Sequence, residues 1–464
     1  MLDLLIVTGA LAFLMIAAYR GYSVILCAPL AAMGAVLLTS PAALAPVFSD
    51  VFMDRMVGFA KLYLPVFMLG AVFGKLIELS GFSRTIVQSV LRLIGADRAI
   101  LAIVLVCALL TYGGVSLFVV VFAVYPFAAE MFRQGNIPKR LMPGAIALGA
   151  FTFTMTALPG TPQIQNIIPT SFFDTTTWAA PWLGLIGAAM TLTGGLAYLE
   201  WRRMRAARAG EGYGTELLNE PAPPAGEQGH HPLIALLPLL VVGVSNFAFT
   251  RLIPGWYPVG TEIVLPGLSE PVVARTEQLL AIWAVMAALI SGIVVILLFA
   301  WRNVVSKLAE GSRDAVSGAL LASMNTAAEY GFGGVIAALP GFLVVASALK
   351  AIPDPLVGEA VAVTALAGIT GSASGGMSIA LAAMADTFIA SAQAAGIPME
   401  VLHRVAAMAS GGMDTLPHNG AVITLLAVTG LSHRQSYGDI FAITLIATAA
   451  VFGVIGVHYM TGIV

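Results

Sequence analysis

Apolar runs of about 20 residues recur along most of the chain, and each is long enough to cross a bilayer as a helix. Hydrophobic residues make up 59% of the chain and charged residues only 10%, and the mean hydropathy is +0.93. Because lipid offers backbone groups no hydrogen-bond partners, spanning segments must satisfy their own. We therefore predict an all-α polytopic membrane protein with about ten full spans.

Charge, cysteine content and sequence motifs give no indication of nucleic-acid binding, a metal site or proteolysis. The net charge of −2 does not indicate nucleic-acid binding, because the charges fall in loops. Cys27 and Cys107 lie in apolar runs, so neither a disulfide nor a metal site is predicted, and no cofactor is expected. The chain has no H-E-x-x-H motif, which argues against an intramembrane protease. Asp3 precedes the first run and Arg20 follows it, so we interpret that run as a retained span rather than a signal peptide.

The runs fall into two halves, residues 1–200 and 232–464, separated by a polar segment at 201–231 that we interpret as a flexible cytoplasmic linker. In the first half the expected spans are 2–19, 22–39, 59–80 and 178–200, with a re-entrant helical hairpin at about 99–131 and an interrupted helix at about 139–170. In the second half the expected spans are 233–250, 276–301, 318–349 and 438–460, with a hairpin at about 357–394 and an interrupted helix at about 399–431.

The distribution of Lys and Arg predicts the orientation. If both hairpins are re-entrant, most of the basic residues fall on one side, which the positive-inside rule makes cytoplasmic. Both termini are then extracytoplasmic. The basic residues assigned to the outer side are Arg55, Lys61, Arg251, Arg275, Lys350 and Arg404.

Short motifs recur in the same order in the two halves. Gly113-Gly114-Val115-Ser116 matches Gly375-Gly376-Met377-Ser378. Met155-Thr156-Ala157-Leu158-Pro159 matches Met413-Asp414-Thr415-Leu416-Pro417. An odd number of crossings in each half would invert the second half relative to the first. Inverted repeats with paired, Gly/Pro-interrupted helices are typical of secondary transporters, which bind substrate near the membrane midplane.

Each interrupted helix breaks at a polar stretch, the first break at residues 154–166 and the second at Met413–Gly420. Half-helices that begin at the hairpin tips direct backbone amides toward the same region, where a carboxylate would be stabilised. No Arg or Lys falls in a tip or a break. The alternative is that the small residues only permit close helix packing. The predicted substrate-binding residues are Tyr112, Gly113, Gly114, Ser116, Thr156, Gly160, Thr161, Gln163, Asn166, Ser372, Ser374, Gly375, Gly376, Ser378, Thr415, His418 and Asn419.

Three residues are candidates for ion coupling. Asp414 lies in the second break, where an intramembrane carboxylate indicates function, and we predict that it carries a proton or contributes to a sodium site. His418 titrates near neutral pH and is a candidate proton relay. Glu329 lies within a span. The alternatives are a static helix cap for Asp414 and ordinary hydrogen bonding for His418 and Glu329.

Several of these segments resemble the gluconate permease family of proton-coupled carboxylate symporters. The resemblance lies in Gly21-Tyr22-Ser23, Leu69–Lys75, Ala157–Pro162 and Ser410–Gly420. The chain is more similar to the branch associated with 3-hydroxybutyrate than to the gluconate branch, whose first break is richer in His and Pro than Gly160-Thr161-Pro162-Gln163.

This resemblance implies an ion-transporter-type fold with a dimerising scaffold domain, a mobile transport domain that carries both hairpins in an elevator mechanism, and a location in the inner membrane of a bacterium. We therefore predict a secondary active symporter that imports a small hydroxy-carboxylate with protons, and not an enzyme. The alternatives are gluconate as substrate, sodium coupling, and a passive organic-anion channel.

Overall fold

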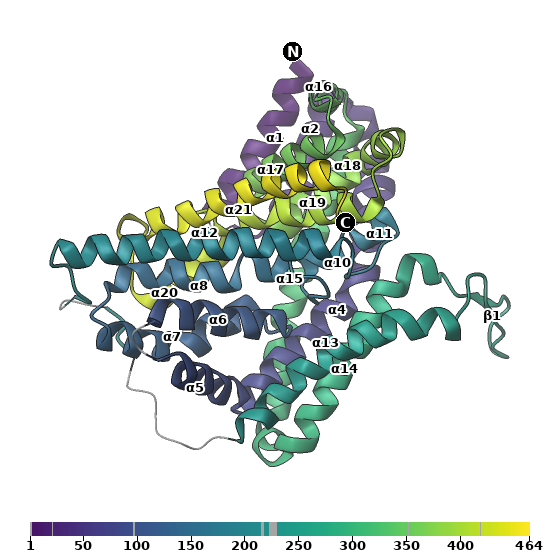
Figure 1. The fold of residues 1–464 in the computed structure, drawn as a ribbon. Coiled ribbons are helices and arrows are strands. Elements are labelled where there is room, and N and C mark those ends of the chain that lie inside the picture. Colours follow the sequence, from purple (N-terminus) through teal and green to yellow (C-terminus); the bar gives the residue numbers. More distant parts are fainter. Residues whose placement is uncertain are drawn as a thin grey trace.

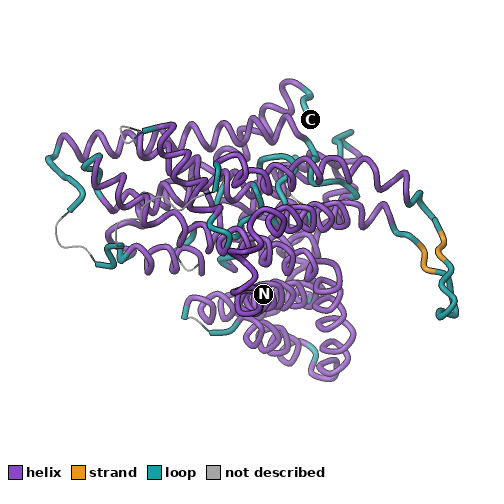
Figure 2. The backbone as a smooth tube through the Cα atoms, turned by 90° about the horizontal axis from the view of Figure 1, so that it is seen from below, coloured by secondary structure: helices purple, strands orange, loops and turns teal. Residues whose placement is uncertain are grey.

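The computed structural model describes residues 2–20, 22–95, 98–214, 218–221, 230–350, 352–417 and 419–464, and almost all of them are helical (Figures 1 and 2). His418, predicted to bind substrate and relay protons, lies outside the described residues. The helices of the first half are α1 (Leu2–Tyr19), α2 (Val24–Thr39), α3 (Leu44–Pro46), α4 (Asp54–Leu79), α5 (Phe82–Ile94), α6 (Ala99–Tyr112), α7 (Leu117–Gln134), α8 (Met142–Ala150), α9 (Phe153–Thr156), α10 (Ile164–Ile167), α11 (Thr170–Phe173) and α12 (Pro181–Arg208).

The second half repeats this order of elements. Its elements are α13 (Pro232–Trp256), β1 (Glu262–Ile263), β2 (Val272–Val273), α14 (Thr276–Val304), α15 (Leu308–Ala338), α16 (Pro340–Lys350), α17 (Pro355–Thr370), α18 (Ala373–Ala394), α19 (Met399–Gly411), the single turn η6 (Gly412–Thr415), α20 (Gly420–Thr429) and α21 (His433–Thr461). In each half, three long helices precede a short helix, a helix–turn–helix pair, an interrupted helix and a last long helix.

Apolar side chains surround most of these helices, as expected where one face meets protein and the other meets lipid. In α1, Val7 and Leu14 are buried, whereas Leu5 and Ile16 are exposed. In the described part of the chain, six helical stretches are long and apolar enough to cross a membrane, and shorter apolar helices accompany them. One stretch, Thr276–Ala338, contains both α14 and α15, and another is α18, the second arm of a predicted hairpin. The chain is therefore a multi-pass membrane protein.

Two groups of helices lie against each other (Figure 1). Helices α6, α8, α12 and α21 pack together in one group, and α4, α13, α14 and α15 form the other. Helix α15 contacts both α4 and α18, so it joins the second group to the second hairpin. The small hairpin β1–β2 extends away from both groups at the end of α13 and α14 (Figures 1 and 2).

Three features of the fold differ from the sequence-based prediction. The span expected at 318–349 is two helices, because Leu339 has an extended backbone (φ −84°, ψ 144°) and Pro340, without an N–H, begins α16. Helix α5 was not predicted because it is amphipathic rather than continuously apolar, with Phe82 and Ile86 buried. The strands β1 and β2 were not predicted either, since each is only two residues long.

The segment predicted to be a linker makes specific contacts in the part that the structure describes. Helix α12 continues to Arg208, and residues 209–214 and 218–221, here called the strap, bind neighbouring elements through ion pairs. Glu211 accepts hydrogen bonds from Nε and Nη2 of Arg140 at 2.6 and 2.7 Å. Glu220 pairs with Lys139 at 2.7 Å and with Arg133 at 2.6 Å.

Asn219 extends the strap to a second element. Its carbonyl accepts a hydrogen bond from the hydroxyl of Tyr125 on α7 at 2.6 Å, and its side-chain amide donates to the carbonyl of Ala427 on α20 at 2.8 Å. The strap therefore connects the first hairpin to the last segment of the second interrupted helix.

Candidate substrate and ion site

The second break places a carboxylate among donors from three elements. Helix α19 ends at Gly411, and Asp414, only 7% exposed, lies in the single turn that follows. Its Oδ2 accepts a hydrogen bond from Nε2 of Gln165 at 2.8 Å. Its Oδ1 accepts from the backbone N–H of Ala373 at 3.0 Å and from Nδ2 of Asn419 at 3.2 Å. Because Ala373 begins α18, the carboxylate lies at the positive end of that helix.

Asn419 holds the second break against the second hairpin tip. Its Nδ2 also donates to the carbonyl of Gly371 at 2.8 Å, and its Oδ1 accepts from the N–H of Ala421 at 2.7 Å. The second contact caps α20, because asparagine oxygens satisfy free N–H groups at helix starts. A single side chain therefore connects the tip, the carboxylate of Asp414 and the next half-helix.

A second carboxyl group approaches the same tip from α15. Glu329 is 5% exposed, and its Oε2 has no hydrogen-bond partner among the described residues. The group lies beside the Ser372 hydroxyl and close enough to Asp414 to interact electrostatically. A Cβ at Gly375 would collide with Oε2 of Glu329, so glycine is required for this approach. Glu329 and Asp414, both predicted for ion coupling, thus converge on one hairpin tip.

The first tip closes against the first break in a comparable way. The hydroxyl of Tyr112 donates to the carbonyl of Pro159 at 3.0 Å, and Nε2 of Gln163 donates to the carbonyl of Thr111 at 2.7 Å. Gly114 has φ +94°, and a Cβ added to it would lie 3.3 Å from the Pro162 ring. These contacts fix the predicted neutral donors of the first half at the tip.

Gln165 joins the two halves of the site. It lies on α10 in the first break, and its bond to Asp414 connects that break to the second one. The two breaks and the two tips therefore form one hydrogen-bonded network. Sequence analysis did not select Gln165 as a site residue. Its position inside a Pro-rich break, two residues after Gln163, was the only available signal.

Arg404 brings a cation to the first break, although no Arg or Lys lies within a tip or a break in the sequence. The charge distribution assigned it to the outer side, and in the structure it is 0% exposed on α19. Its Nη1 donates to the carbonyl of Thr156 at 2.7 Å and to Oδ1 of Asn166 at 2.9 Å. Its Nε and Nη2 donate to the carbonyl of Ala179 at 3.2 and 2.6 Å. A guanidinium from the second half thus holds the first break together.

Protein groups occupy the hydrogen-bonding positions of the Asn166 side chain. Its Nδ2 donates to the carbonyls of Thr161 and Thr177 at 3.1 and 2.9 Å, and its Oδ1 accepts from Arg404. The imidazole of His403 lies 3.3 Å from the same oxygen and 2.7 Å from the hydroxyl of Thr175. An amide has two donors and two acceptor sites, so Asn166 has no capacity left for a ligand in this structure.

Several other predicted residues have contacts within the protein. The hydroxyl of Thr415 lies 2.6 Å from that of Thr444 on α21. A Cβ at Gly376 would collide with the backbone of Ala367, so this glycine lets the two hairpin arms approach each other. The hydroxyls of Thr156 and Ser378 donate hydrogen bonds to the carbonyls of Thr152 and Ser374, and the hydroxyl of Ser372 lies within hydrogen-bonding distance of that of Ser374. Two glycines pack against side chains: Gly113 against Leu239, and Gly160, with φ +76°, against the Trp178 ring. Ser116 lies at the first tip, where its N–H faces Gly74.

Buried polar atoms without partners gather along this network. Within the described residues they include the hydroxyls of Thr111 and Thr161, Oε1 of Gln165 and Oε2 of Glu329. Leaving a buried donor or acceptor unpaired costs about 1–3 kcal/mol. Native proteins contain few such groups, and each one requires an explanation. Binding of a polar ligand or an ion between the tips and the breaks would supply the missing partners.

Comparisons with known proteins place the chain among transporters. An uncharacterized transporter, YxjC of Bacillus subtilis (strain 168), is 59% identical over 472 residues that cover 100% of both chains. This chain belongs to the same transporter family. The transporter is therefore a membrane protein and not an enzyme. No family model matches it.

A solved structure shows a similar fold. The YdaH transporter of Alcanivorax borkumensis, whose crystal structure is described as having an unusual topology, matches with a TM-score of 0.57 over 92% of this chain and 90% of that one. The two sequences are 15% identical, so the likeness concerns the fold alone.

Proposed function

We propose that this transporter is a symporter of the gluconate permease type that imports a small hydroxy-carboxylate such as 3-hydroxybutyrate together with protons. The observation that carries the proposal is the network around Asp414, in which Gln165 of the first break and Ala373 of the second tip bind the same carboxylate. A site shared by both halves is suited to alternating access, because relative movement of the halves opens it to one side at a time.

The substrate class follows from the donors near the network. Backbone amides at the tips favour a carboxylate, and the unpaired hydroxyls of Thr111 and Thr161 are suited to a hydroxyl or carboxylate oxygen. The guanidinium of Arg404 adds a fixed positive charge behind Asn166 without occupying the space between the tips. The first break has Gly160-Thr161-Pro162-Gln163 where the gluconate branch is richer in His and Pro, which favours a short hydroxy acid over a polyol.

Asp414 and Glu329 are the proposed coupling groups. Two buried carboxyl groups that interact with each other favour binding of one cation, which is a proton in our proposal and sodium in the alternative. Because Ala373, Gln165 and Asn419 all bind Asp414, a change in its charge affects the second tip and both breaks together.

The repeated order of elements supports an inverted repeat with two re-entrant hairpins. In each half, a glycine on the third long helix touches the start of the second hairpin arm. The Cβ that Gly74 lacks would lie 3.5 Å from the backbone nitrogen of Ser116, and that of Gly333 would lie 2.9 Å from Cα of Ile379. We propose that the hairpins move as part of a transport domain, that the remaining helices form a dimerising scaffold, and that both termini lie outside the inner membrane.

Uptake into proteoliposomes tests the proposal. With an imposed pH gradient and no sodium, we expect 3-hydroxybutyrate to accumulate above its external concentration. Accumulation only under a sodium gradient would replace protons by sodium. Flux that ignores both gradients would indicate a passive channel. If no short hydroxy acid is transported under any gradient, the substrate class is wrong.

A further inference from the structure

A third buried carboxyl group lies outside the network described above. Glu359 lies on α17, the first arm of the second hairpin, and is 0% exposed. Neither of its carboxyl oxygens has a hydrogen-bond partner in the described part of the chain. Asp414, by contrast, accepts hydrogen bonds from Gln165, Ala373 and Asn419. The two acidic residues therefore differ in how far the protein supports a negative charge.

Among the side chains that the structure describes, no neighbouring element supplies a counter-charge. Helix α17 packs against α1, α16, α18, α19, α21 and η6. Arg404 of α19 binds backbone carbonyls, and Asp439 of α21 pairs with Arg140 and Arg202. The other charged or titratable groups described on these elements are Asp3, Asp386, Glu400, His403, Asp414, His433, Arg434, Tyr437, His458 and Tyr459, and none of them has a bond to Glu359. The side chain of Lys350 on α16 lies outside the described residues.

Because Glu359 has no described hydrogen-bond partner, burial disfavours its charged form. Moving an unpaired carboxylate into an apolar interior costs several kcal/mol even after relaxation. A neutral carboxylic acid avoids most of that cost, because only its polar atoms lose contact with water. Glu359 is therefore compatible with its surroundings when it holds a proton, and it must release that proton whenever its surroundings become hydrated.

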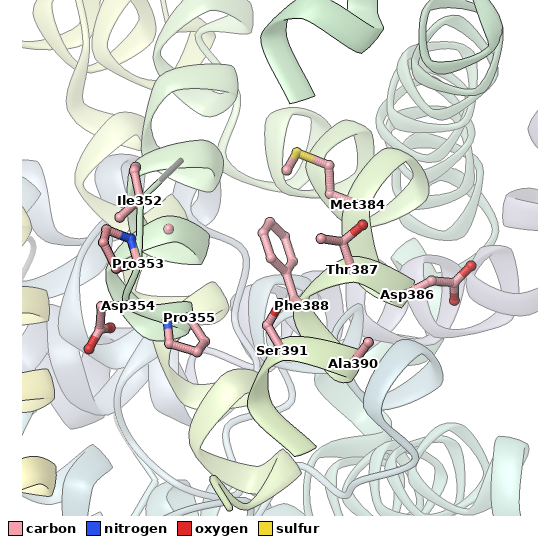
Figure 3. Close-up of a pocket in the computed structure, with 11 residues that line it drawn as sticks. Ile352, Pro353, Asp354, Pro355, Met384, Asp386, Thr387, Phe388, Ala390 and Ser391 are labelled. Carbon is pink, nitrogen blue, oxygen red and sulfur yellow. The ribbon is translucent and has the colours of Figure 1, made fainter. Parts of the chain in front are cut away.

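A cavity lies near this residue, although Glu359 is not one of its lining residues. It has a volume of about 500 Å³ and lies between the two arms of the hairpin, at the end away from the tip (Figure 3). Its walls include Pro355 and Gly358 of α17, and Thr387 and Ser391 of α18. Glu359 directly follows Gly358 and lies one helical turn beyond Pro355. Figure 3 shows the ring of Phe388 between the 352–355 segment and Met384, with the Asp386 side chain pointing away from them.

We propose that Glu359 is a proton-binding site of the second hairpin, reached through this cavity, and that it acts as a coupling site separate from Asp414. Its carboxylate takes a proton from water when the cavity end of the hairpin is hydrated, forming a neutral acid that is buried with the hairpin. It returns the proton to water when the hairpin is exposed again. This inference rests on the proposed proton coupling for its role in transport, but proton binding at Glu359 is independent of the substrate.

Infrared difference spectroscopy of the purified full-length protein tests proton binding without any substrate. We expect the wild type at neutral pH to show carbonyl-stretch bands of buried protonated carboxylic acids, and Glu359→Gln to lack one band that Asp414→Asn and Glu329→Gln retain. Asp386→Asn, which removes an exposed carboxylate lining the same cavity, is the matched control and should leave the band unchanged. A spectrum of Glu359→Gln identical to that of the wild type would overturn the proposal.

Transport then tests the coupling role. With 3-hydroxybutyrate in proteoliposomes, loss of one coupled proton lowers the limiting accumulation ratio by about tenfold per pH unit of gradient. We expect this loss in Glu359→Gln, with counterflow exchange retained, and wild-type accumulation in Asp386→Asn. Accumulation by Glu359→Gln equal to the wild type would exclude the coupling role.

The outcomes separate the two proposals. If the wild type itself accumulates no hydroxy acid under a pH gradient, the proposed function fails, while the infrared band still decides whether Glu359 holds a proton. Glutamine is neutral and of the same size as a protonated glutamate, so the variant should fold. Should it not be recovered as a monodisperse protein, Glu359→Met provides a neutral substitute for the same two measurements.

Discussion

The two breaks differ in the charge that each one encloses. The first contains only neutral side chains and is closed around the guanidinium of Arg404, which comes from the second half. The second contains the carboxylate of Asp414, which is bound by Gln165 from the first half. Each break is thus completed by a residue of the other half. Two segments that match in sequence have opposite electrostatic roles, so the first is suited to hold shape and the second to respond to an ion.

The largest effect is expected at Arg404. Arg404→Met leaves the carbonyls of Thr156 and Ala179 and Oδ1 of Asn166 without their donor, at about 1–3 kcal/mol for each buried unpaired group. We expect a large fall in the thermal midpoint of the purified protein, or no folded protein.

Two further variants control this prediction. Arg404→Lys should recover only part of the stability, because one ammonium lacks the planar fork that reaches three acceptors. Arg434→Met removes an exposed cation and should be neutral. If Arg404→Met were as stable as Arg434→Met, the first break would not depend on the cation.

Asp414→Asn is expected to lower concentrative uptake while the protein still folds. The amide keeps the size of the side chain but replaces one acceptor oxygen by a donor, which faces the donors Gln165, Ala373 and Asn419. The variant should lose pH-driven accumulation by about tenfold per pH unit and keep exchange. Asp386→Asn is again the control. Undiminished accumulation in Asp414→Asn would remove the functional difference between the breaks.

Glycines in the two breaks should respond differently to alanine. Gly160 in the first break has φ +76° and faces the Trp178 ring, so Gly160→Ala meets left-handed strain of roughly 1–2 kcal/mol and a collision. Gly420 in the second break begins α20 and has open space around its missing Cβ, so Gly420→Ala should be tolerated. Thermal midpoints of the two variants test this, and equal midpoints would contradict a tightly packed first break.

The smallest effect is expected at the strap. The hydrogen bond from Arg140 lowers the pKa of Glu211 from its ordinary value of 4.5. A carboxyl group whose pKa is lowered by folding stabilises the folded protein at pH values above its ordinary pKa. This stabilisation is lost as the pH falls through the lowered pKa. The wild type should therefore exceed Glu211→Gln in thermal midpoint by a small margin at neutral pH, and the margin should vanish in acid. A margin that does not change with pH would mean that the ion pair is not its source.

Local sequence predicted much of the fold because the bilayer restricts what the backbone can do. The pairs of Pro and Gly inside apolar runs predicted both interrupted helices, and α19 does end at Gly411. Asp414 was identified because a carboxylate is rare in such a run. The boundary between α15 and α16 was missed, although Pro340 indicated it, because the apolar run continues past that residue.

The sequence alone did not predict which residues contact the site residues. Arg404 was assigned only to the outer side, and its hydrogen bonds to Thr156, Asn166 and Ala179 join segments more than 200 residues apart. Gln165 and Asp414 are separated by 249 residues, and no local pattern pairs them. Likewise, nothing near Glu211 in the sequence indicates its bond to Arg140.

By itself, the sequence determined that this chain is a helical membrane protein with two interrupted helices and a carboxylate at the second interruption, because those features depend on hydrophobicity and backbone hydrogen bonding along the chain. Only the tertiary structure decided that Asp414 is bound by three donors, that Arg404 closes the first break and that Glu359 has no hydrogen-bond partner among the described residues. The reason is that the charge state and role of a buried group depend on which distant atoms surround it, and packing of the two halves sets those distances.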